Sequence, residues 1–387
     1  MTRGDYGRIS IFVLVDALGW RFAQKHAFLS DILPRRHEMT TVLGFSSAAI
    51  PTVLSGRMPE EHGHWCLFRR RRFLSCFSWA LPVLALPPVI RENYRTRNAI
   101  GALTRSLFNI TGYFCLYEVP VSVLPRLDYV ERKDLWTPGA LSGCKNIFDE
   151  LKVNAVAYYA SGWRNTDEQK LASCLGAVVE SPVQCCFLYL SELDAALHTH
   201  GPDSEGARQA LVAAGVRIRR LLARAADLYS DVRLFVFSDH GMTTVSGTHD
   251  LQSALRQARA SGPLRRAAFF AFYDSTMARF WPRNKDARQA LEEFLSSLPY
   301  GRVLSEDDRA ELGLRFRGNE YGDVIFVMDH GRVIVPSFAS SAAPRAMHGF
   351  RPSDPDSAAC LLAANELKTP PVHVKDMYSV FLNELGI

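Results

Sequence analysis

The chain has 387 residues, of which 48% are hydrophobic, and Lys and Arg outnumber Asp and Glu by 45 to 40. This length accommodates one large α/β domain with an inserted piece, or two domains. The net charge of +5 gives no reason to expect a nucleic-acid partner. The eight cysteines form no CxxC pair, which excludes a disulfide framework and a cysteine-type zinc site. A reducing compartment follows by default, and we expect a cytoplasmic location.

The first predicted element is a strand over residues 9–16, ISIFVLVD. A continuous apolar run of this length is typical of a parallel strand that is buried on both faces. No signal-peptide cleavage pattern accompanies it. Next, Ser46 and Ser47 precede a short predicted helix over residues 48–54, which ends at Gly56. A serine at a helix N-terminus lies where phosphate binds well, whether it acts as a cap or as a nucleophile.

Residues 66–137 break the pattern, since they are rich in Arg, Pro and aromatic residues without a strand–helix rhythm. We interpret them as an inserted cap over the edge of the sheet. The stretch over residues 73–90 is barely long enough to span a membrane, and its three prolines argue against a spanning helix. An apolar lid or a membrane-touching segment is the better interpretation. The arginine run at residues 69–72 is expected to be a solvated loop or a phosphate-facing patch.

Strands and helices alternate in the rest of the chain. Further buried strands are predicted over residues 154–160, 185–191 and 233–239. Helices are predicted over residues 143–151, 167–178, 204–228, 287–298 and 374–385. A hairpin with its turn at 329–331 is predicted within a small α+β subdomain, residues 263–335. The alternation indicates a doubly wound, mostly parallel α/β sheet flanked by helices. Residues 1–65, 138–262 and 336–387 would form that core.

The predicted strands deliver aspartates to one edge of the sheet. Asp16 and Asp239 end two strands, and Asp194 follows a third. Ligands of open α/β sheets bind beyond the carboxyl ends of the strands. Asp194 and His198 are four residues apart and share a helical face, a pairing that suits a divalent transition metal.

Four further histidines are weighed for this site. His240 adjoins Asp239, and His348 lies near the C-terminus, where it is again followed by a Gly. His200 is a rival to His198 that would point elsewhere on the turn. His330 falls in the predicted hairpin turn and is left out of the site.

These pieces, in this order, resemble the alkaline phosphatase superfamily, and within it the type I phosphodiesterase/nucleotide pyrophosphatase branch. The resemblance rests on Asp16, on a hydroxyl that lies ten residues before the Gly of the segment SGRMPEEHG, and on three short motifs. These motifs are DAALH at residues 194–198, DHGM at 239–242 and HGFRP at 348–352. Together with Asp16, they span residues 16–352. The resemblance implies a two-metal site with zinc as the expected ion and manganese as the alternative. It implies one ion held by Asp194, His198 and His348, and another held by Asp16, Asp239, His240 and Ser46.

The same resemblance implies the nucleophile. Counting back from Gly56 reaches Ser46 rather than Ser47. The branch typically has an Asn three residues after the nucleophile, where this chain has Ala49. Another donor, such as the backbone N–H of Ser47 or an arginine from the cap, would then contact the phosphoryl group. Arg69 and Arg70 are the candidates for that role. His62 matches a position that we expect to be structural.

The sequence therefore predicts a metal-dependent phosphoric ester hydrolase that acts on a diester or pyrophosphate through a phosphoseryl intermediate. A phosphomonoesterase, a phosphonate hydrolase and a phosphotransferase remain open for the same site. An inactive binding protein of the same fold is an alternative of another class, which the full set of ligands argues against. The expected partner is a small phosphate ester, including nucleotide-linked or lipid-linked ones, and no transmembrane span is expected. The oligomeric state stays undetermined.

Overall fold

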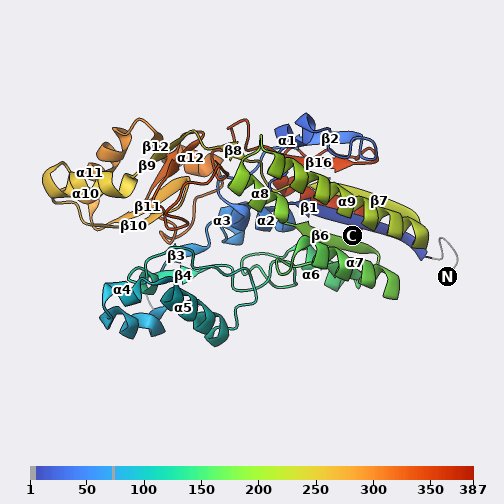
Figure 1. Cartoon of the computed structure of the whole chain (residues 1–387), viewed down its shortest axis with the longest axis horizontal. Coiled ribbons are helices and arrows are strands. Elements are labelled where there is room, and N and C mark those ends of the chain that lie inside the picture. Colours follow the sequence, from blue (N-terminus) through green and yellow to red (C-terminus); the bar gives the residue numbers. More distant parts are fainter. Residues whose placement is uncertain (1–5, 72–74) are drawn as a thin grey trace.

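A computed structural model describes residues 6–71 and 75–387. Residues 72–74 include Arg72 of the arginine run and Phe73 and Leu74 of the apolar stretch, so these three residues lie outside the described part. The largest sheet has six strands in the order β2-β16-β7-β1-β6-β5, and helices cover both of its faces (Figure 1). Its strands are β1 (Tyr6–Val15), β2 (Arg35–Met39), β5 (Tyr158–Ala160), β6 (Cys185–Leu190), β7 (Tyr229–Phe237) and β16 (Ala359–Ala363).

The central strand β1 is buried because it pairs in parallel on both sides, with β6 and with β7. β5 extends the parallel run beyond β6, whereas β16 is antiparallel to both β7 and β2. The predicted doubly wound, mostly parallel α/β fold is thus confirmed. The strand predicted from residue 154 begins only at Tyr158, since Asn154 still caps the preceding helix and Ala155 adopts a left-handed turn.

Side chains of β1 alternate between two cores. Phe12 and Leu14 pack into one core, and Ile11, Val13 and Val15 pack into the other. The first core is covered by α2 (Ser46–Ser55), α6 (Ile147–Val153) and α13 (Met377–Leu385). The second is covered by α7 (Asp167–Glu180), α8 (Glu192–His200) and α9 (Glu205–Leu228). All these helices except α8 coincide, within a few residues at their ends, with helices predicted from the sequence.

A second sheet, β10-β11-β13-β12, is antiparallel throughout. Its strands are β10 (Phe269–Tyr273), β11 (Met277–Pro282), β12 (Gly301–Val303) and β13 (Val324–Met328), and its neighbouring helices are α10 (Leu251–Ser261), α11 (Lys285–Ser296) and α12 (Glu306–Glu311). The predicted hairpin at 329–331 is wrong. A turn does form there, but β14 (Arg332–Ile334) leaves β13 and pairs in parallel with β9 (Gly247–His249). Tertiary pairing overrides the local hairpin signal at this point.

The arginine- and aromatic-rich segment packs against this second sheet. It contains β3 (Phe68–Arg70), the 3₁₀ helix η1 (Ser78–Ala85), α4 (Pro88–Arg91), α5 (Tyr94–Leu107), η2 (Leu124–Arg126) and β4 (Leu127–Tyr129). Phe68 and Tyr129 share one hydrophobic cluster with Phe272 and Phe280. No helix in the described part of the chain is long and apolar enough to cross a membrane.

Short elements complete the chain. They are α1 (Trp20–Lys25), α3 (Pro59–His62), β8 (Thr243–Thr244), β15 (Ala346–Met347) and η3 (Val374–Asp376). The strand β15 pairs with β8 and thereby holds the segment that follows it, which contains His348, beside the turn after β7. The eight cysteines are all free thiols.

Candidate metal centre

Three adjacent parallel strands end at the same edge of the large sheet. Asp16 directly follows β1, and Asp239 and His240 follow β7. The strand β6 leads into α8, whose first turn carries Asp194 and whose last turn carries His198. The carboxyl ends of β7, β1 and β6 therefore gather the acidic residues that the sequence placed at strand ends.

The first cluster contains Asp16, Asp239 and His240, which are all buried and offer ligand atoms within 4.8 Å of one another. Nε2 of His240 lies 3.6 Å from Asp16 Oδ1 and 3.2 Å from Asp239 Oδ2. The other imidazole nitrogen, Nδ1, lies 3.0 Å from the carbonyl of Gly241. That contact orients the ring and aims Nε2 at the carboxylates.

Backbone groups hold the turn that carries this cluster. The amides of Ala17 and His240 donate to Asp239 Oδ1, at 3.4 and 3.1 Å, which leaves Oδ2 facing the cluster. Ala17 adopts a left-handed conformation, with φ at 60°, directly after Asp16. Gly241 is required because a Cβ there would lie 2.1 Å from the carbonyl oxygen of Asp356. Strain and close packing at this point are typical of a functional turn.

The second cluster contains Asp194, His198 and His348. Asp194 Oδ1 lies 3.3 Å from His198 Nε2 and 3.7 Å from His348 Nε2. Nδ1 of His198 lies 2.8 Å from the carbonyl of Ala346, so the backbone again orients the imidazole. The two clusters adjoin, since the rings of His240 and His348 stack with their centroids 3.8 Å apart.

Burial and mutual charge shift the pKa values of these groups. Burial, followed by the charge of Asp194, raises the pKa of Asp239 to about 7, and burial likewise raises that of Asp16. Burial and the neighbouring His240 lower the pKa of His348. Burial alone would lower the pKa of His198, but the charge of Asp194 outweighs it and raises the value to about 9. The carboxylates of Asp16, Asp194 and Asp239 repel one another at this spacing, so bound positive charge would stabilise their ionised forms.

The donor set fits divalent metal ions. Four buried atoms at the centre have no hydrogen-bond partner in the described part of the chain: Asp16 Oδ1, Asp194 Oδ1, Asp239 Oδ2 and His348 Nδ1. Buried polar atoms are rarely left without a partner unless an ion or water satisfies them. Carboxylate and imidazole donors suit zinc and other divalent transition metals. The two clusters can therefore hold one ion each.

Ser46 joins this centre from α2. It is the first residue of the helix, with Phe45 as the N-cap, and its Oγ lies 3.0 Å from His240 Nε2. Ser47 points elsewhere, because its hydroxyl donates to the carbonyl of Trp65 at 3.2 Å. The helix N-terminus leaves backbone N–H groups without helical partners, which favours an anionic group there.

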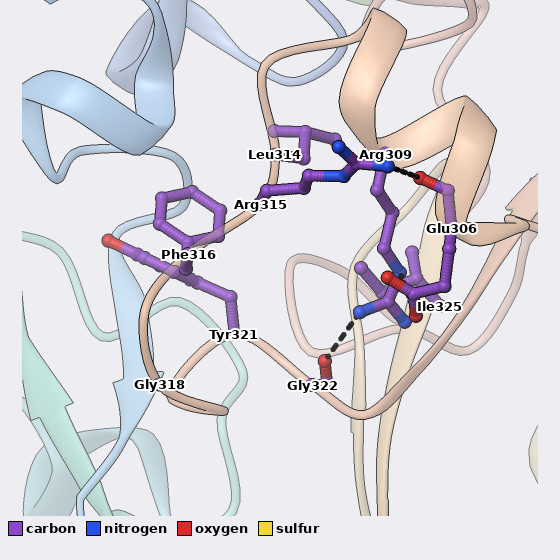
Figure 2. A pocket seen from close by; sticks show the side chains of 9 residues that line it. All are labelled: Glu306, Arg309, Leu314, Arg315, Phe316, Gly318, Tyr321, Gly322 and Ile325. Carbon is purple, nitrogen blue, oxygen red and sulfur yellow. Dashed lines mark hydrogen bonds and ion pairs between the residues drawn. The ribbon is translucent and has the colours of Figure 1, made fainter.

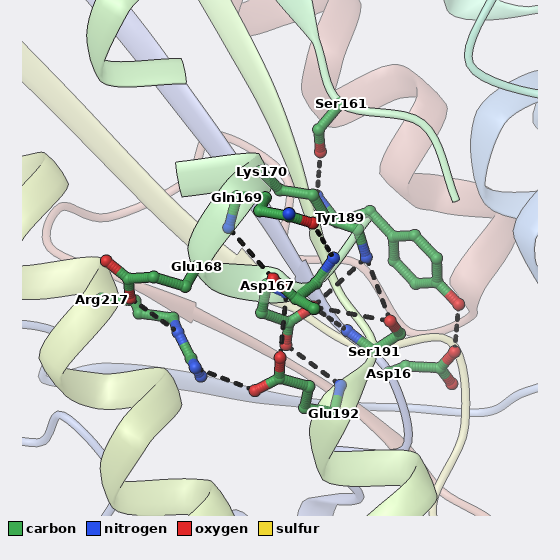
Figure 3. Close-up of polar contacts among 11 residues, drawn as sticks. Asp16, Ser161, Asp167, Glu168, Gln169, Lys170, Tyr189, Ser191, Glu192 and Arg217 are labelled. Carbon is green, nitrogen blue, oxygen red and sulfur yellow. Dashed lines mark hydrogen bonds and ion pairs between the residues drawn. The ribbon is translucent and has the colours of Figure 1, made fainter. Parts of the chain in front are cut away.

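Tyr189 supports the centre, although the sequence analysis missed it. Its hydroxyl donates to Asp16 Oδ2, and the ammonium of Lys170 lies 4.7 Å from its ring centroid (Figure 3). Lys170 is itself buried, and it contacts Asp167 Oδ1 at 3.2 Å and Ser191 Oγ at 3.0 Å. The sequence did contain a hint of this contact, because Tyr189 lies inside the apolar run of β6 and a buried phenol hydroxyl needs a polar partner.

The other residues discussed in the sequence analysis lie either in the hydrophobic core or in the cap. Ala49 is buried in the core, so its side chain donates nothing to a ligand. His62 is buried, with its nitrogens engaged by Thr52 and by the amide of His64, and is structural as expected. Arg69 pairs with the buried Asp128 at 3.4 Å. Arg70 stacks over Phe270 and Trp281, on the side of the second sheet. A substrate-binding role for these arginines stays a prediction.

The rival His200 and the excluded His330 both lie outside the two clusters. His330 pairs with Asp354 and Asp356 at 3.9 and 3.3 Å. His200 is exposed at the end of α8. A pocket of about 110 Å³ is lined by other residues than the metal centre (Figure 2). In this pocket Arg309 donates to the carbonyl of Gly322, and Arg315 donates to the carbonyl of Glu306. None of its lining residues belongs to either cluster.

Solved structures with the same fold were found. Murine ectonucleotide pyrophosphatase/phosphodiesterase 5 aligns with a TM-score of 0.69 and 15% identity, over 98% of this chain and 95% of its own. An inactive variant of that murine protein, in complex with AMP, aligns with a TM-score of 0.68 and 16% identity, over 100% and 96%. The human protein aligns with a TM-score of 0.68 and 14% identity, over 98% and 95%. At this identity the likeness shows the fold alone.

Among curated protein sequences, no match was found. The family profile described as type I phosphodiesterase/nucleotide pyrophosphatase matches residues 95–351, well over half of the chain. That stretch includes Asp194, His198, Asp239, His240 and His348. The profile, the fold and the paired clusters agree with the resemblance that the sequence motifs indicated. The chain therefore belongs to the type I phosphodiesterase/nucleotide pyrophosphatase family.

Proposed function

We propose that this protein hydrolyses a phosphodiester or pyrophosphate at a two-metal centre, with Ser46 as the nucleophile. The observation that carries the proposal is the position of Ser46 Oγ, 3.0 Å from His240 Nε2, beside two clusters with orphaned ligand atoms. A hydroxyl needs activation before it attacks phosphorus. A serine hydroxyl that adjoins a cluster fit for a divalent ion is placed to receive that activation.

The chain would hold one ion through Asp194, His198 and His348, and the other through Asp16, Asp239, His240 and Ser46. Two divalent ions, most suitably zinc and alternatively manganese, would lower the pKa of a hydroxyl or water that binds them. Their positive charge would also stabilise the negative charge on the phosphoryl group. Ser46 provides the attacking oxygen, and the N-terminus of α2 favours the phosphate beside it. Tyr189 holds the carboxylate of Asp16 in position.

The covalent chemistry proceeds in two displacements. Ser46 Oγ forms a bond to phosphorus while the bond to the leaving alcohol or phosphate breaks. Water then attacks the phosphoserine, which releases the phosphate product and regenerates the hydroxyl. Ala49 supplies no side-chain donor for the phosphoryl group, and the backbone amide of Ser47, in the first turn of α2, is the substitute we favour.

A nucleotide-linked substrate is supported by the murine relative that was solved with AMP. A phosphomonoester, a phosphonate and transfer to another alcohol remain the alternatives at the same centre. An inactive binding protein is disfavoured because both clusters and the hydroxyl are present. We also propose that the protein works in the cytoplasm, in line with its eight free thiols.

The test measures metal content by elemental mass spectrometry on the wild type and Ser46→Ala. Hydrolysis of bis-p-nitrophenyl phosphate and p-nitrophenyl phosphate is followed in parallel. We expect about two zinc or manganese ions per chain, as two clusters imply. We also expect diester turnover that Ser46→Ala abolishes while it retains at least the ion of the second cluster. Preference for the monoester would favour a phosphatase. Absence of bound metal after reconstitution, together with absence of turnover, would refute the proposal.

A further inference from the structure

The cap exposes an unusual amount of apolar surface. Residues 81–90, LPVLALPPVI, form an unbroken apolar run in which no residue is buried. Nine of the thirteen exposed large hydrophobic residues in the described chain lie between residues 81 and 117. Val89 is 80% exposed, and Leu107 on α5 is 62% exposed. A run of exposed apolar residues such as 81–90 indicates an interaction site, whereas single exposed residues do not.

This surface has a fixed shape. Trp79 Nε1 in η1 donates to Thr104 Oγ1 in α5 at 3.2 Å, and Thr96 Oγ1 donates to the carbonyl of Ile90 at 2.6 Å. Arg91 also donates to the carbonyl of Leu84 at 3.1 Å. These contacts tie η1, α4 and α5 together at the periphery of the molecule, away from the six-stranded sheet (Figure 1). The apolar side chains are therefore presented outward by an ordered scaffold.

The charges beside this surface are mostly positive. Among residues 75–118 there are four arginines, no lysine and two acids, Glu92 and Glu118, and Glu118 accepts a hydrogen bond from Ser341. Glu92 is already engaged, since Arg91 contacts it at 2.9 Å and the amide of Val121 donates to it. Arg95 and Arg97 have no acidic partner in the described part of the chain. The apolar surface thus carries a net positive fringe.

We propose that η1, α4 and α5 dock this protein onto a lipid bilayer that contains anionic headgroups. The exposed side chains of residues 81–90 and of Leu103 and Leu107 would enter the boundary between headgroups and acyl chains. Arg95 and Arg97 would remain at the level of the anionic headgroups. A small apolar surface binds a bilayer stably only when a basic patch adds to its affinity, and this surface has both features. The contact lies on the membrane surface and does not depend on turnover at Ser46.

The test is co-flotation with lipid vesicles. One vesicle preparation is phosphatidylcholine alone, and in the other roughly a third of the lipid is phosphatidylglycerol. The wild-type protein should float with the anionic vesicles and more weakly with the neutral ones, and added salt should weaken the anionic binding. Val89→Ser/Leu107→Ser should reduce the partition coefficient about tenfold or more. Arg95→Gln/Arg97→Gln should remove most of the preference for anionic vesicles.

The matched control is Val212→Ser/Val216→Ser, which removes two valines that are 53% and 51% exposed on α9. Its flotation should equal that of the wild type, and every variant should keep the wild-type unfolding midpoint. Three results would overturn the proposal: no flotation of the wild type, equal binding to both vesicles, or an equal loss in the control. Sedimentation that shows a dimer dispersed by Val89→Ser/Leu107→Ser would instead assign this face to a second copy of the chain.

Discussion

The hydroxyl of Tyr189 should set the affinity of one metal cluster and leave the other unchanged. Tyr189 donates to Oδ2 of Asp16, whose other oxygen has no hydrogen-bond partner in the described chain. In Tyr189→Phe the carboxylate loses this support and can rotate away from Asp239 and His240. The ring itself remains, so the packing of Trp136 at 5.4 Å and the contact with Lys170 are retained.

Loss of a partner that orients a metal ligand costs roughly 10–100-fold in affinity. This corresponds to about 1.4–2.7 kcal/mol for the ion of the cluster that contains Asp16. The ion of the cluster that contains Asp194 should bind as in the wild type, because its orienting contact is His198 to Ala346. Competition with a chromophoric chelator, titrated with Zn²⁺, resolves the two dissociation constants.

Tyr158→Phe is the matched control, since Tyr158 lies on the neighbouring strand β5 and packs against Phe148. It should leave both dissociation constants unchanged. If Tyr189→Phe weakened both ions equally, or neither, the tyrosine would not act through Asp16. A fall in the unfolding midpoint with unchanged affinities would show that its role is only structural.

Three further predictions concern stability. Phe12→Ala should cost about 3–5 kcal/mol in urea unfolding, because Phe12 is fully buried between Phe187, Phe235 and Phe381; a cost below about 1 kcal/mol would contradict this packing. Gly241→Ala should lower metal content and the unfolding midpoint together, since its Cβ would lie 2.1 Å from a carbonyl oxygen; wild-type values for both would show that the turn yields easily. Burial raises the pKa of Glu131 to about 8, so the folded chain retains a proton that the unfolded chain loses above its ordinary pKa. Glu131 should therefore make stability fall as the pH rises towards 8, by at most about 1.4 kcal/mol per pH unit, and Glu131→Gln should make the slope in urea unfolding shallower by that amount, while the share of Asp239 remains; equal slopes in both proteins would contradict it.

The parallel centre of the sheet was predictable because its strands contain apolar runs, whereas the edge strand β2, with the sequence RRHEM, has no such run and was not predicted. β6, the last seven residues of β1 and the last four of β7 are continuous buried runs, which are typical of parallel strands covered on both faces. The aspartates that follow them converge by topology, whereas the grouping of His348 with Asp194 and His198 was expected only from the family resemblance. β16 was missed, because ACLLA is too short to distinguish from a helix segment by periodicity.

Non-local contacts explain what the sequence did not predict. β14 pairs with β9, which lies some eighty residues earlier, so the Asp-His-Gly turn at 329–331 joins two different sheets. The hydroxyl of Tyr189 finds Asp16 from a different strand, and a single tyrosine in an apolar run does not identify its partner. The cap has no periodicity from which its fold could be predicted, and its exposed apolar face was visible only as composition.

The distribution of the clusters along the chain sets the order in which they can form during synthesis. Asp16 is made early but lacks its cluster partners until Asp239 and His240 emerge after β7. The cluster that contains Asp194 and His198 is completed last, by His348, which β15 holds in place. A ribosome-bound chain that extends past His240 thus carries every residue of the first cluster and two of the three residues of the second. Metal loading would be sequential, and a chain truncated before residue 348 could hold at most a single ion.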